Sequence, residues 1–253
     1  MASDLADLKD RAERLRQLHT GDLLVLPNAW DAASATVVVE AGFPVVATAS
    51  AAVSAMLGHP DGEGAPWQEM FAAAGRIIRV VSVPVTVDAE AGYGMQPDEL
   101  VHRLLAIGAV GCNLEDTDHR AGGLAEAGAH ARWLAGVRSA ADAAGVPIVI
   151  NARVDTFLPS SGVAEPDRIA ETVRRGRLYR EAGADCIYPI GVQHRADLAA
   201  LVAELPGPIN GNTGDFLDLA TLRELGVARV SYGPRFYRAA LADLKTSLQQ
   251  LLP

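Results

Sequence analysis

Short apolar runs alternate with longer amphipathic stretches along the whole chain. The apolar runs are rich in Val, Ile and Leu and commonly begin at Pro or Gly, as in Pro84-Val85-Thr86-Val87-Asp88. Such runs are typical of strands that are buried on both faces of a parallel sheet. They predict eight strands, within residues 23–27, 44–48, 83–88, 110–115, 147–153, 185–190, 208–212 and 228–232.

The stretches between these runs have the spacing of amphipathic helices. Leu5, Leu8 and Leu15, for example, fall on one face of a helix near the N-terminus. Several stretches end at Gly, which suits the left-handed C-cap of a helix. They predict helices within residues 3–19, 66–80, 97–107, 167–182, 195–204, 216–225 and 234–251, and helices that end near Gly42 and Gly145.

A strand followed by a helix, repeated eight times, predicts one (β/α)8 barrel, or TIM barrel, of the α/β class. The predicted domain covers residues 1–253 and has an N-terminal helix ahead of the first strand. No linker or low-complexity tract divides it. The alternative is a doubly wound open sheet.

Polar side chains gather at the C-terminal ends of the predicted strands. In a (β/α)8 barrel these ends meet at one mouth, where active sites lie. Polar residues follow seven of the eight strands, whereas the opposite strand ends are mostly Pro, Val and Ala. The polar residues are Asn28, Asp31, Thr48, Ser50, Asp88, Glu90, Glu115, Asn151, Arg153, Asn210, Asn212 and Ser231.

The composition narrows the classes of function. With 253 residues, 49% of them hydrophobic, the chain is long enough for a large core. The net charge of −9 and the lack of a basic run argue against nucleic acid as a partner. Cys112 and Cys186 lie inside apolar runs, so we expect structural thiols. With neither a secretory signal nor a membrane-spanning run, we expect a cytoplasmic protein without membrane association.

Asp88 and Glu90 stand one residue apart, where a buried strand gives way to Ala91-Gly92-Tyr93-Gly94. On a strand, both carboxylates would point the same way. Mg²⁺ takes oxygen ligands, keeps several waters and is usually held by one or two carboxylates. The pair therefore predicts a site for Mg²⁺ (or Mn²⁺). The alternative interpretation is an exposed strand end with two solvated acids.

Five segments together resemble the isocitrate lyase/phosphoenolpyruvate mutase superfamily. They are Asn28-Ala29-Trp30-Asp31, Leu57-Gly58-His59-Pro60-Asp61, Asp88-Ala89-Glu90-Ala91-Gly92-Tyr93-Gly94, Asn113-Leu114-Glu115-Asp116 and Asn151-Ala152-Arg153-Val154-Asp155. The resemblance implies a barrel whose last helix is often exchanged between subunits of a homo-oligomer, a tetramer or a dimer. It also implies Mg²⁺-assisted making or breaking of C–C or P–C bonds beside a 2-oxo acid.

The acids of these segments would form the metal site. Asp88 is the expected direct ligand, and Glu90, Glu115 and Asp61 would hold metal-bound waters. A metal would also explain the cluster, because carboxylates repel each other unless a cation lies among them. Asp61 has the alternative interpretation of a turn residue in His59-Pro60-Asp61-Gly62.

Arg153 is the expected partner of the metal at the reacting oxygens. Bond cleavage beside a ketone or hydroxyl leaves an enolate, whose charge a metal and an arginine can stabilise together. The alternative for Arg153 is a structural salt bridge to Glu115 or Asp155. We expect Arg153, Glu115 and His119 to be the catalytic residues.

Small side chains in Thr48-Ala49-Ser50-Ala51-Ala52 would let backbone N–H groups approach a substrate carboxylate, as the corresponding loop does in the superfamily. Tyr93 would stack beside the metal loop or the substrate, or pack at the barrel rim. Asn210 and Asn212 would contact the distal end of the substrate or cap a turn. The residues predicted to bind substrate are Thr48, Ser50, Ala51, Asn210, Asn212 and Tyr93.

One motif of the superfamily is missing. Isocitrate and methylisocitrate lyases carry a catalytic Cys after the fourth strand, where this chain reads Glu115-Asp116-Thr117-Asp118-His119-Arg120-Ala121-Gly122-Gly123. The Lys and Asn of phosphoenolpyruvate mutases are absent there too. His119 and Arg120 remain as an acid–base group and an anion-binding group, and Gly122-Gly123 could hinge a lid. The alternative for His119 is an exposed loop histidine.

We therefore expect an enzyme: a Mg²⁺-dependent lyase that cleaves a C–C bond of a small anionic 2-oxo or 2-hydroxy carboxylate through a metal-stabilised enolate. Two alternatives stay open. One is a P–C bond enzyme, such as a phosphonopyruvate hydrolase or a carboxyphosphonoenolpyruvate mutase. The other is a barrel that binds a 2-oxo acid without turnover.

Overall fold

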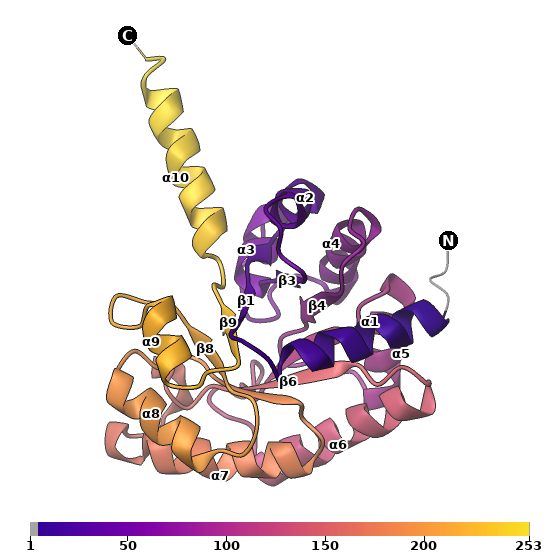
Figure 1. Ribbon diagram of the computed structural model, residues 1–253, viewed down its shortest axis with the longest axis vertical. Coiled ribbons are helices and arrows are strands. Elements are labelled where there is room, and N and C mark those ends of the chain that lie inside the picture. Colours follow the sequence, from indigo (N-terminus) through magenta and orange to yellow (C-terminus); the bar gives the residue numbers. More distant parts are fainter. Residues whose placement is uncertain (1–4, 253) are drawn as a thin grey trace.

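The computed structural model describes residues 5–252, and these residues form the predicted (β/α)8 barrel (Figure 1). The first four residues and the last residue of the predicted domain lie outside the described part. The strands are β1 (Leu24–Leu26), β2 (Asn28–Ala29), β3 (Val46–Thr48), β4 (Val85–Asp88), β5 (Gly111–Glu115), β6 (Val149–Val154), β7 (Cys186–Pro189), β8 (Asn210–Asn212) and β9 (Arg229–Ser231).

All strand pairs are parallel. β1 lies within the first predicted strand, and β2 continues it past Pro27. Pro27 separates them because proline has no N–H to donate to a strand ladder. β1 pairs with β9, and β2 pairs with β3, so the first strand joins both edges of the wall. A parallel bridge between Ile187 and Ile209 connects β7 to β8. Every neighbouring pair of strands around the barrel is therefore joined.

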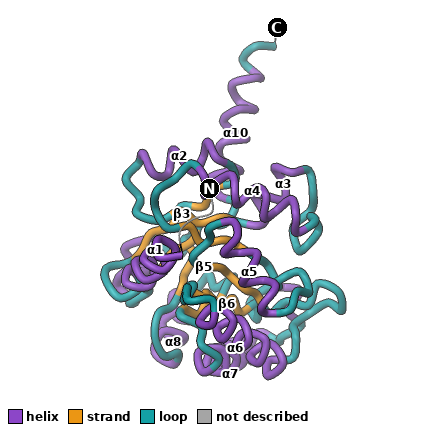
Figure 2. The backbone as a smooth tube through the Cα atoms, turned by 90° about the vertical axis from the view of Figure 1, so that its right-hand side faces the viewer, coloured by secondary structure: helices purple, strands orange, loops and turns teal. Residues whose placement is uncertain are grey.

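The helices surround the strands, as the purple coils outside the orange wall show in Figure 2. The first turn of α3 includes part of the small-residue segment 48–52, which the sequence analysis treated as a loop. The helices are α1 (Leu5–Leu18), α2 (Ala32–Glu40), α3 (Ser50–Leu57), α4 (Trp67–Arg79), α5 (Pro97–Ile107), α6 (Ala127–Ala143), α7 (Arg168–Glu181), α8 (Arg195–Glu204), α9 (Leu219–Glu224) and α10 (Arg235–Gln249).

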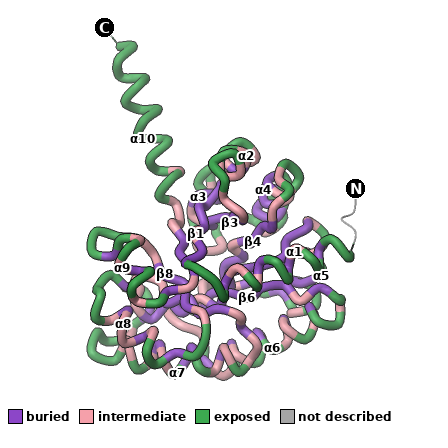
Figure 3. Tube along the Cα trace, viewed as in Figure 1, coloured by how far each residue is buried: buried purple, intermediate pink, exposed green. Residues whose placement is uncertain are grey.

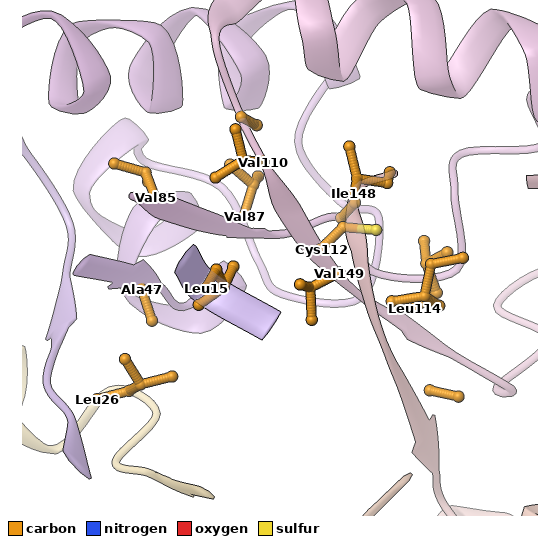
Figure 4. Close-up of a cluster of buried hydrophobic side chains, with 14 of the residues drawn as sticks. Leu15, Leu26, Ala47, Val85, Val87, Val110, Cys112, Leu114, Ile148 and Val149 are labelled. Atoms are coloured by element: carbon orange, nitrogen blue, oxygen red, sulfur yellow. The ribbon is translucent and has the colours of Figure 1, made fainter. Parts of the chain in front are cut away.

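The N-terminal helix α1 closes the barrel at the end opposite the mouth. Its Leu15 is fully buried, and a Cβ added at Gly111 would meet Leu15 Cδ2 at 2.8 Å. Figure 4 shows the Leu15 side chain among the apolar side chains of the strands. Arg16, one residue on, donates to Pro147 O and to Asp185 Oδ1, both at 2.8 Å. The predicted N-terminal helix is thus a plug for the barrel floor.

The outward faces of the strands pack against the helices and form the apolar core. Val87, Leu114 and Cys112 belong to this layer, which Figure 4 shows in part. Cys112 and Cys186 are free thiols and completely buried, and burial raises the pKa of each to about 12. At neutral pH they are therefore protonated, apolar packing groups, as the sequence predicted.

The last helix, α10, extends away from the barrel (Figure 1), and none of its residues is buried (Figure 3). Leu241, Leu244 and Leu248 on this helix are each about half exposed, at 47 to 53%. Within residues 5–252, no helix has the length and apolar character needed to cross a bilayer.

Candidate active site

The C-terminal ends of the strands bring most of the predicted site residues to one mouth. Asp88 of β4 is level with Asn113 of β5, and Glu115 of β5 is level with Arg153 of β6. Arg153 is in turn level with Tyr188 of β7. Residues two apart on a strand face the same way, so Asn113 lies one layer below Glu115 inside the barrel. The register therefore gathers an acid, an arginine and a tyrosine in one row.

Asp88 ends β4 with its carboxylate beside the N-terminus of α3. Its Oδ2 accepts a hydrogen bond from Ser50 N at 2.9 Å, and its own backbone N donates to Thr48 Oγ1 at 2.8 Å. Its Oδ1 is buried without a hydrogen-bond partner. A buried carboxylate oxygen without a partner is costly unless a cation or a water meets it. Asp88 is thus the acid best placed to bind a metal directly.

Glu90 reaches the same mouth through a turn, because β4 ends at Asp88. Glu90 and Tyr93 have φ of +51° and +55°, left-handed conformations that are uncommon outside glycine. Glu90 Oε1 accepts from the Tyr93 hydroxyl at 2.6 Å, and Oε2 accepts from Glu63 N. Burial raises the pKa of Glu90, and the charge of Asp88 adds to the rise. The prediction that strand alternation aligns Asp88 with Glu90 is therefore wrong, although both carboxylates lie at one mouth.

Glu115 is the centre of a buried charge cluster. Its Oε1 lies 2.5 Å from His119 Nε2, and its Oε2 forms an ion pair with Arg153 Nη1. Arg153 also binds Asp155 through Nε and Nη2, both at 2.7 Å. The structural salt bridges considered for Arg153 are thus both present. They fix the guanidinium in one orientation, with 13% of the side chain exposed.

The Glu115–His119 pair titrates near neutrality. Burial raises the pKa of Glu115 to about 7, while the charge of Arg153 and the hydrogen bond from His119 oppose the rise. The hydrogen bond to Glu115 raises the pKa of His119. The hydrogen bond between Glu115 and His119 therefore couples the protonation of the two groups.

The predicted carboxylate-binding segment lies against Asp88. Thr48 and Ser50 are buried, and their hydrogen bonds hold the Asp88 carboxylate and its backbone. Ala51 is half-buried in the first turn of α3. A contact between Thr48, Ser50 or Ala51 and a substrate carboxylate stays a prediction.

Asp61 and Tyr93 lie at the rim beside Glu90. Asp61 is exposed in the loop between α3 and α4, and its charge contributes to the raised pKa of Glu90. That position suits a residue that holds a metal-bound water better than it suits a direct ligand. The Tyr93 ring meets Phe71 edge-on at 6.2 Å while its hydroxyl binds Glu90. Tyr93 therefore packs at the rim and orders the turn that carries Glu90, while its contact with a substrate stays a prediction.

Asn210 and Asn212 were both predicted to contact the distal end of the substrate, but they lie at different depths in the barrel. Asn210 is fully buried below the mouth, where its Oδ1 accepts from Asn151 Nδ2 at 3.2 Å and from Ser231 Oγ at 3.0 Å. The predicted contact of Asn210 with the distal end of a substrate is therefore wrong, because no part of the residue reaches the mouth. Asn212 is half-buried at the mouth and lines a cavity together with Tyr188.

The residues at the mouth fit a hydrated Mg²⁺. Across residues 5–252, no three His, Cys, Asp or Glu side chains form a ready-made metal cage of the kind that zinc requires. Mg²⁺ does not need one, because it keeps several waters and takes one or two carboxylates. Asp88 offers a buried oxygen without a partner, and Glu90 and Glu115 lie close enough to Asp88 for its charge to raise their pKa values. That Glu90, Glu115 and Asp61 would accept hydrogen bonds from metal-bound waters stays a prediction.

The segment after β5 forms a short ordered loop over one side of the mouth. Asp118 Oδ1 accepts from the backbone N of Arg120 and of Ala121, both at 2.9 Å, and Thr117 forms an antiparallel bridge with Leu124. This loop directs His119 inward, so that 18% of its side chain is exposed. The alternative of an exposed loop histidine is therefore wrong.

Sequence reasoning missed three residues of the site. Glu63 binds the metal loop through its backbone N and accepts from Tyr93 N at 2.5 Å, and Thr117 donates to Asp155 Oδ2 at 2.5 Å. Tyr188 is buried beside Arg153. Tyr188 lies near the C-terminal end of a predicted strand, like the other site residues, so its position in the sequence could have indicated it. No sequence pattern indicated Glu63 or Thr117, because only the folding of the loops brings them to the site.

Comparisons with known proteins agree with this geometry. The family profile described as phosphoenolpyruvate phosphomutase matches residues 15–252. An uncharacterized protein of Mycobacterium tuberculosis is 33% identical over 88% of this chain and 82% of its own length. An oxaloacetate decarboxylase of Rhodopseudomonas palustris is 31% identical over 85% of this chain and 77% of its own length.

A solved structure from Burkholderia cenocepacia, provisionally described as a phosphonomutase, superposes with a TM-score of 0.89 at 38% identity. The match covers 96% of this chain and 99% of the other.

Proposed function

This chain belongs to the phosphoenolpyruvate mutase/isocitrate lyase superfamily of lyases and mutases, and from that premise we propose a Mg²⁺-dependent C–C lyase of small 2-oxo or 2-hydroxy carboxylates. The observation that carries the proposal is Asp88 Oδ1, buried at the mouth without a partner and beside the Glu115–Arg153 pair. A hydrated divalent cation at Asp88 would satisfy that oxygen. When bound, Mg²⁺ would supply Lewis-acid stabilisation of negative charge on a substrate oxygen.

Arg153 is proposed to stabilise the same charge from the other side. A guanidinium has five N–H donors, and Nε, Nη2 and Nη1 of Arg153 each direct one toward Asp155 or Glu115. Two N–H groups remain for substrate oxygens. Because buried Asp155 accepts hydrogen bonds from Nε and Nη2 and fixes the guanidinium, Arg153 needs no reorganisation to meet developing charge.

Glu115 and His119 are proposed to handle the proton at the reacting carbon. Glu115 lies between His119 and Arg153, and His119 Nδ1 faces Gly62, since a Cβ there would meet it at 3.2 Å. The proton would therefore reach the substrate from the Glu115 carboxyl, with His119 acting through Glu115. This pair would stand in for the lid Cys that the chain lacks.

We further propose that α10 packs on a neighbouring subunit. An apolar stripe on an isolated helix is stable only when another surface covers it. A groove of about 520 Å³, lined by Trp30, Val37 and Phe43 around α2 and by Phe236 of α10, is open for such a helix. A second copy of the chain supplies the matching element, which supports a homo-oligomer, a tetramer or a dimer.

P–C bond chemistry is the second candidate. The 38% identity to the Burkholderia cenocepacia protein, over nearly the whole of both chains, favours it. A P–C enzyme would release phosphate from phosphonopyruvate or rearrange a phosphonate, whereas a C–C lyase would release pyruvate, glyoxylate or oxalate.

The test combines binding with turnover. Titration calorimetry with oxalate, a mimic of the enolate, is run with Mg²⁺ and with EDTA on the wild type, on Asp88→Asn and on Asp10→Asn. Asp10 is exposed on α1 at the far end of the barrel and serves as the matched control. We expect Mg²⁺-dependent oxalate binding that Asp88→Asn weakens by about a hundredfold and Asp10→Asn leaves intact.

A screen of 2-oxo acids, 2-hydroxy acids and phosphonates with Mg²⁺ then identifies the reaction from pyruvate, glyoxylate and phosphate released. Oxalate binding that ignores both Mg²⁺ and the Asp88 substitution would refute the metal site. Phosphate release without C–C cleavage would move the assignment to the second candidate.

A further inference from the structure

A second cavity opens at the C-terminal ends of β7, β8 and β9, next to the mouth. Its volume is about 370 Å³, enough for a substituent of several carbons. The walls come from the ends of three strands and the segments that follow them. Residues that bear on the argument are Tyr188, Ile190, Asn212, Asp215, Phe216 and Tyr232.

This cavity adjoins the mouth through residues that lie next to the predicted site. Tyr188 lies level with Arg153 on the neighbouring strand. On the other side, Tyr232 N donates to Asn28 Oδ1 at 2.8 Å, and Asn28 Nδ2 donates to Thr48 O at 2.7 Å. Thr48 in turn holds Asp88. The cavity is therefore the neighbouring space for a substituent on a ligand whose head lies between Asp88 and Arg153.

The cavity has no cation in its wall. Among its lining residues, all of which lie in the described part of the chain, Asp215 alone carries a charge, and that charge is negative. Arg235 contacts the wall from outside: its Nη1 donates to Thr213 Oγ1 at 2.9 Å and its Nη2 to Thr213 O at 2.8 Å. Arg235 is also exposed, so water screens it.

The remaining surface suits a neutral group. Ile190 and Phe216 offer apolar contact, while Asn212 and the Tyr188 hydroxyl offer neutral hydrogen bonds. Burial raises the pKa of Tyr188 to about 12, so its hydroxyl stays protonated. A carboxylate that entered this cavity would lose part of its hydration without gaining an opposite charge from the lining residues. An alkyl group would gain by leaving water.

We propose that this cavity selects the third substituent of the substrate, and that the substituent is a neutral alkyl or hydroxyalkyl arm. The substrate class is then a 2-hydroxy or 2-oxo dicarboxylate with a neutral arm on the carbon next to the head, and a tricarboxylate is excluded. This inference rests on the proposed lyase function and restricts the range of substrates that the lyase would accept.

The test uses two ligands of equal shape. Isocitrate is malate with a carboxymethyl arm, and 3-isobutylmalate carries an isobutyl group in the same place. With Mg²⁺ present, each competes against oxalate, which has no arm and reports on the head site alone. We expect 3-isobutylmalate to bind at least tenfold more tightly than isocitrate and to be the better substrate.

Variants at Ile190 give a second measurement. Ile190→Arg adds a cation to the wall and should shift the preference toward isocitrate by at least tenfold, whereas Ile190→Met, the matched control, should keep the wild-type preference. Equal or tighter binding of isocitrate by the wild type would overturn the inference while leaving the lyase proposal standing. Failure of oxalate itself to bind would instead refute the proposed lyase function.

Discussion

The carboxylate of Asp88 shows how the site depends on single side chains. One oxygen is held by Ser50 N, while the other is buried without a partner. The backbone N of the same residue is held by the hydroxyl of Thr48, which is 3% exposed. Thr48 and Ser50 thereby set the direction in which Asp88 presents its open oxygen.

Replacing Thr48 should therefore weaken the metal site without touching a ligand. Thr48→Val keeps the shape but leaves Asp88 N unpaired, which costs about 1–3 kcal/mol in unfolding free energy. We expect Mg²⁺-dependent oxalate affinity to fall about tenfold or more, measured by calorimetry. Thr48→Ser retains the hydroxyl and should behave like the wild type. If Thr48→Val binds Mg²⁺ and oxalate as tightly as Thr48→Ser does, the positioning role is refuted.

Single residues also mark where the sequence was informative. Arg153 and Glu115 could be predicted because each ends a buried strand, and strand ends meet at the mouth. Asn210 was grouped with the polar strand ends too, yet it is the first residue of β8 and its side chain is buried in a hydrogen-bonded layer. A position near the end of a strand does not by itself say whether a side chain reaches the mouth or lies in the buried layer beneath it.

At the scale of elements, the turn after β4 builds the metal loop. Glu90 and Tyr93 adopt left-handed conformations, and Gly92 between them has φ +85° with a Trp133 ring atom 2.7 Å from where a Cβ would lie. The turn therefore requires glycine at 92 for two reasons, its backbone angle and the close approach of Trp133. The sequence indicated a tight turn there but not that the turn itself would aim Glu90.

Helix α10 is the element whose apolar side chains are least covered by the described part of the chain. Its leucines face solvent, and the groove beside α2 is open. We expect the double substitution Leu244→Glu with Leu248→Glu to shift the protein from oligomer to monomer in light scattering coupled to size exclusion. The same change on the opposite helical face, Ala239→Glu with Thr246→Glu, is the control and should leave the oligomer intact.

Both pairs of variants should keep the thermal unfolding of the barrel near the wild-type value at equal oligomeric state, because the four substituted side chains are exposed and do not pack in their own barrel. A wild-type protein that is monomeric at micromolar concentration would contradict the proposed exchange of α10.

At the scale of the whole molecule, the barrel interior changes character from floor to mouth. Leu15 plugs the floor, above it lies a layer of buried amides, and the charged cluster occupies the mouth. Within the amide layer, fully buried Arg229 donates to Asn113 Oδ1 at 3.0 Å, while burial lowers the pKa of Arg229 and the charge of Asp88 opposes that effect. The layer thus places a cation beneath an acidic mouth.

Two buried histidines should make global stability depend on pH. Burial lowers the pKa of His19 and of His130 to about 4. In the unfolded chain each takes up a proton near pH 6.5, whereas the folded chain does not until about pH 4. Stability is therefore highest above pH 6.5 and is lost as the pH falls toward 4, by about 2 kcal/mol per histidine between pH 7 and pH 5.

His130→Phe tests this linkage, because His130 packs between aromatic rings, at 5.7 Å from Trp133 and 5.1 Å from Tyr179. Urea unfolding at pH 7 and pH 5 should show a difference smaller by about 2 kcal/mol in His130→Phe than in the wild type. His102→Gln, at an exposed position of α5, is the control and should keep the wild-type difference. An unchanged difference in His130→Phe would show that His130 does not resist protonation in the folded state.

The sequence by itself determined the strands, most of the helices and most of the polar residues near the strand ends, because hydrophobic periodicity and position along a strand are local properties of the chain. Tertiary structure alone decided that a left-handed turn carries Glu90 to the mouth and that Asn210 lies beneath it. It also decided that His119 points inward and that α10 finds no cover in its own subunit. These outcomes depend on contacts between segments that lie far apart in the sequence. The energies of such contacts cannot be inferred from a local sequence pattern.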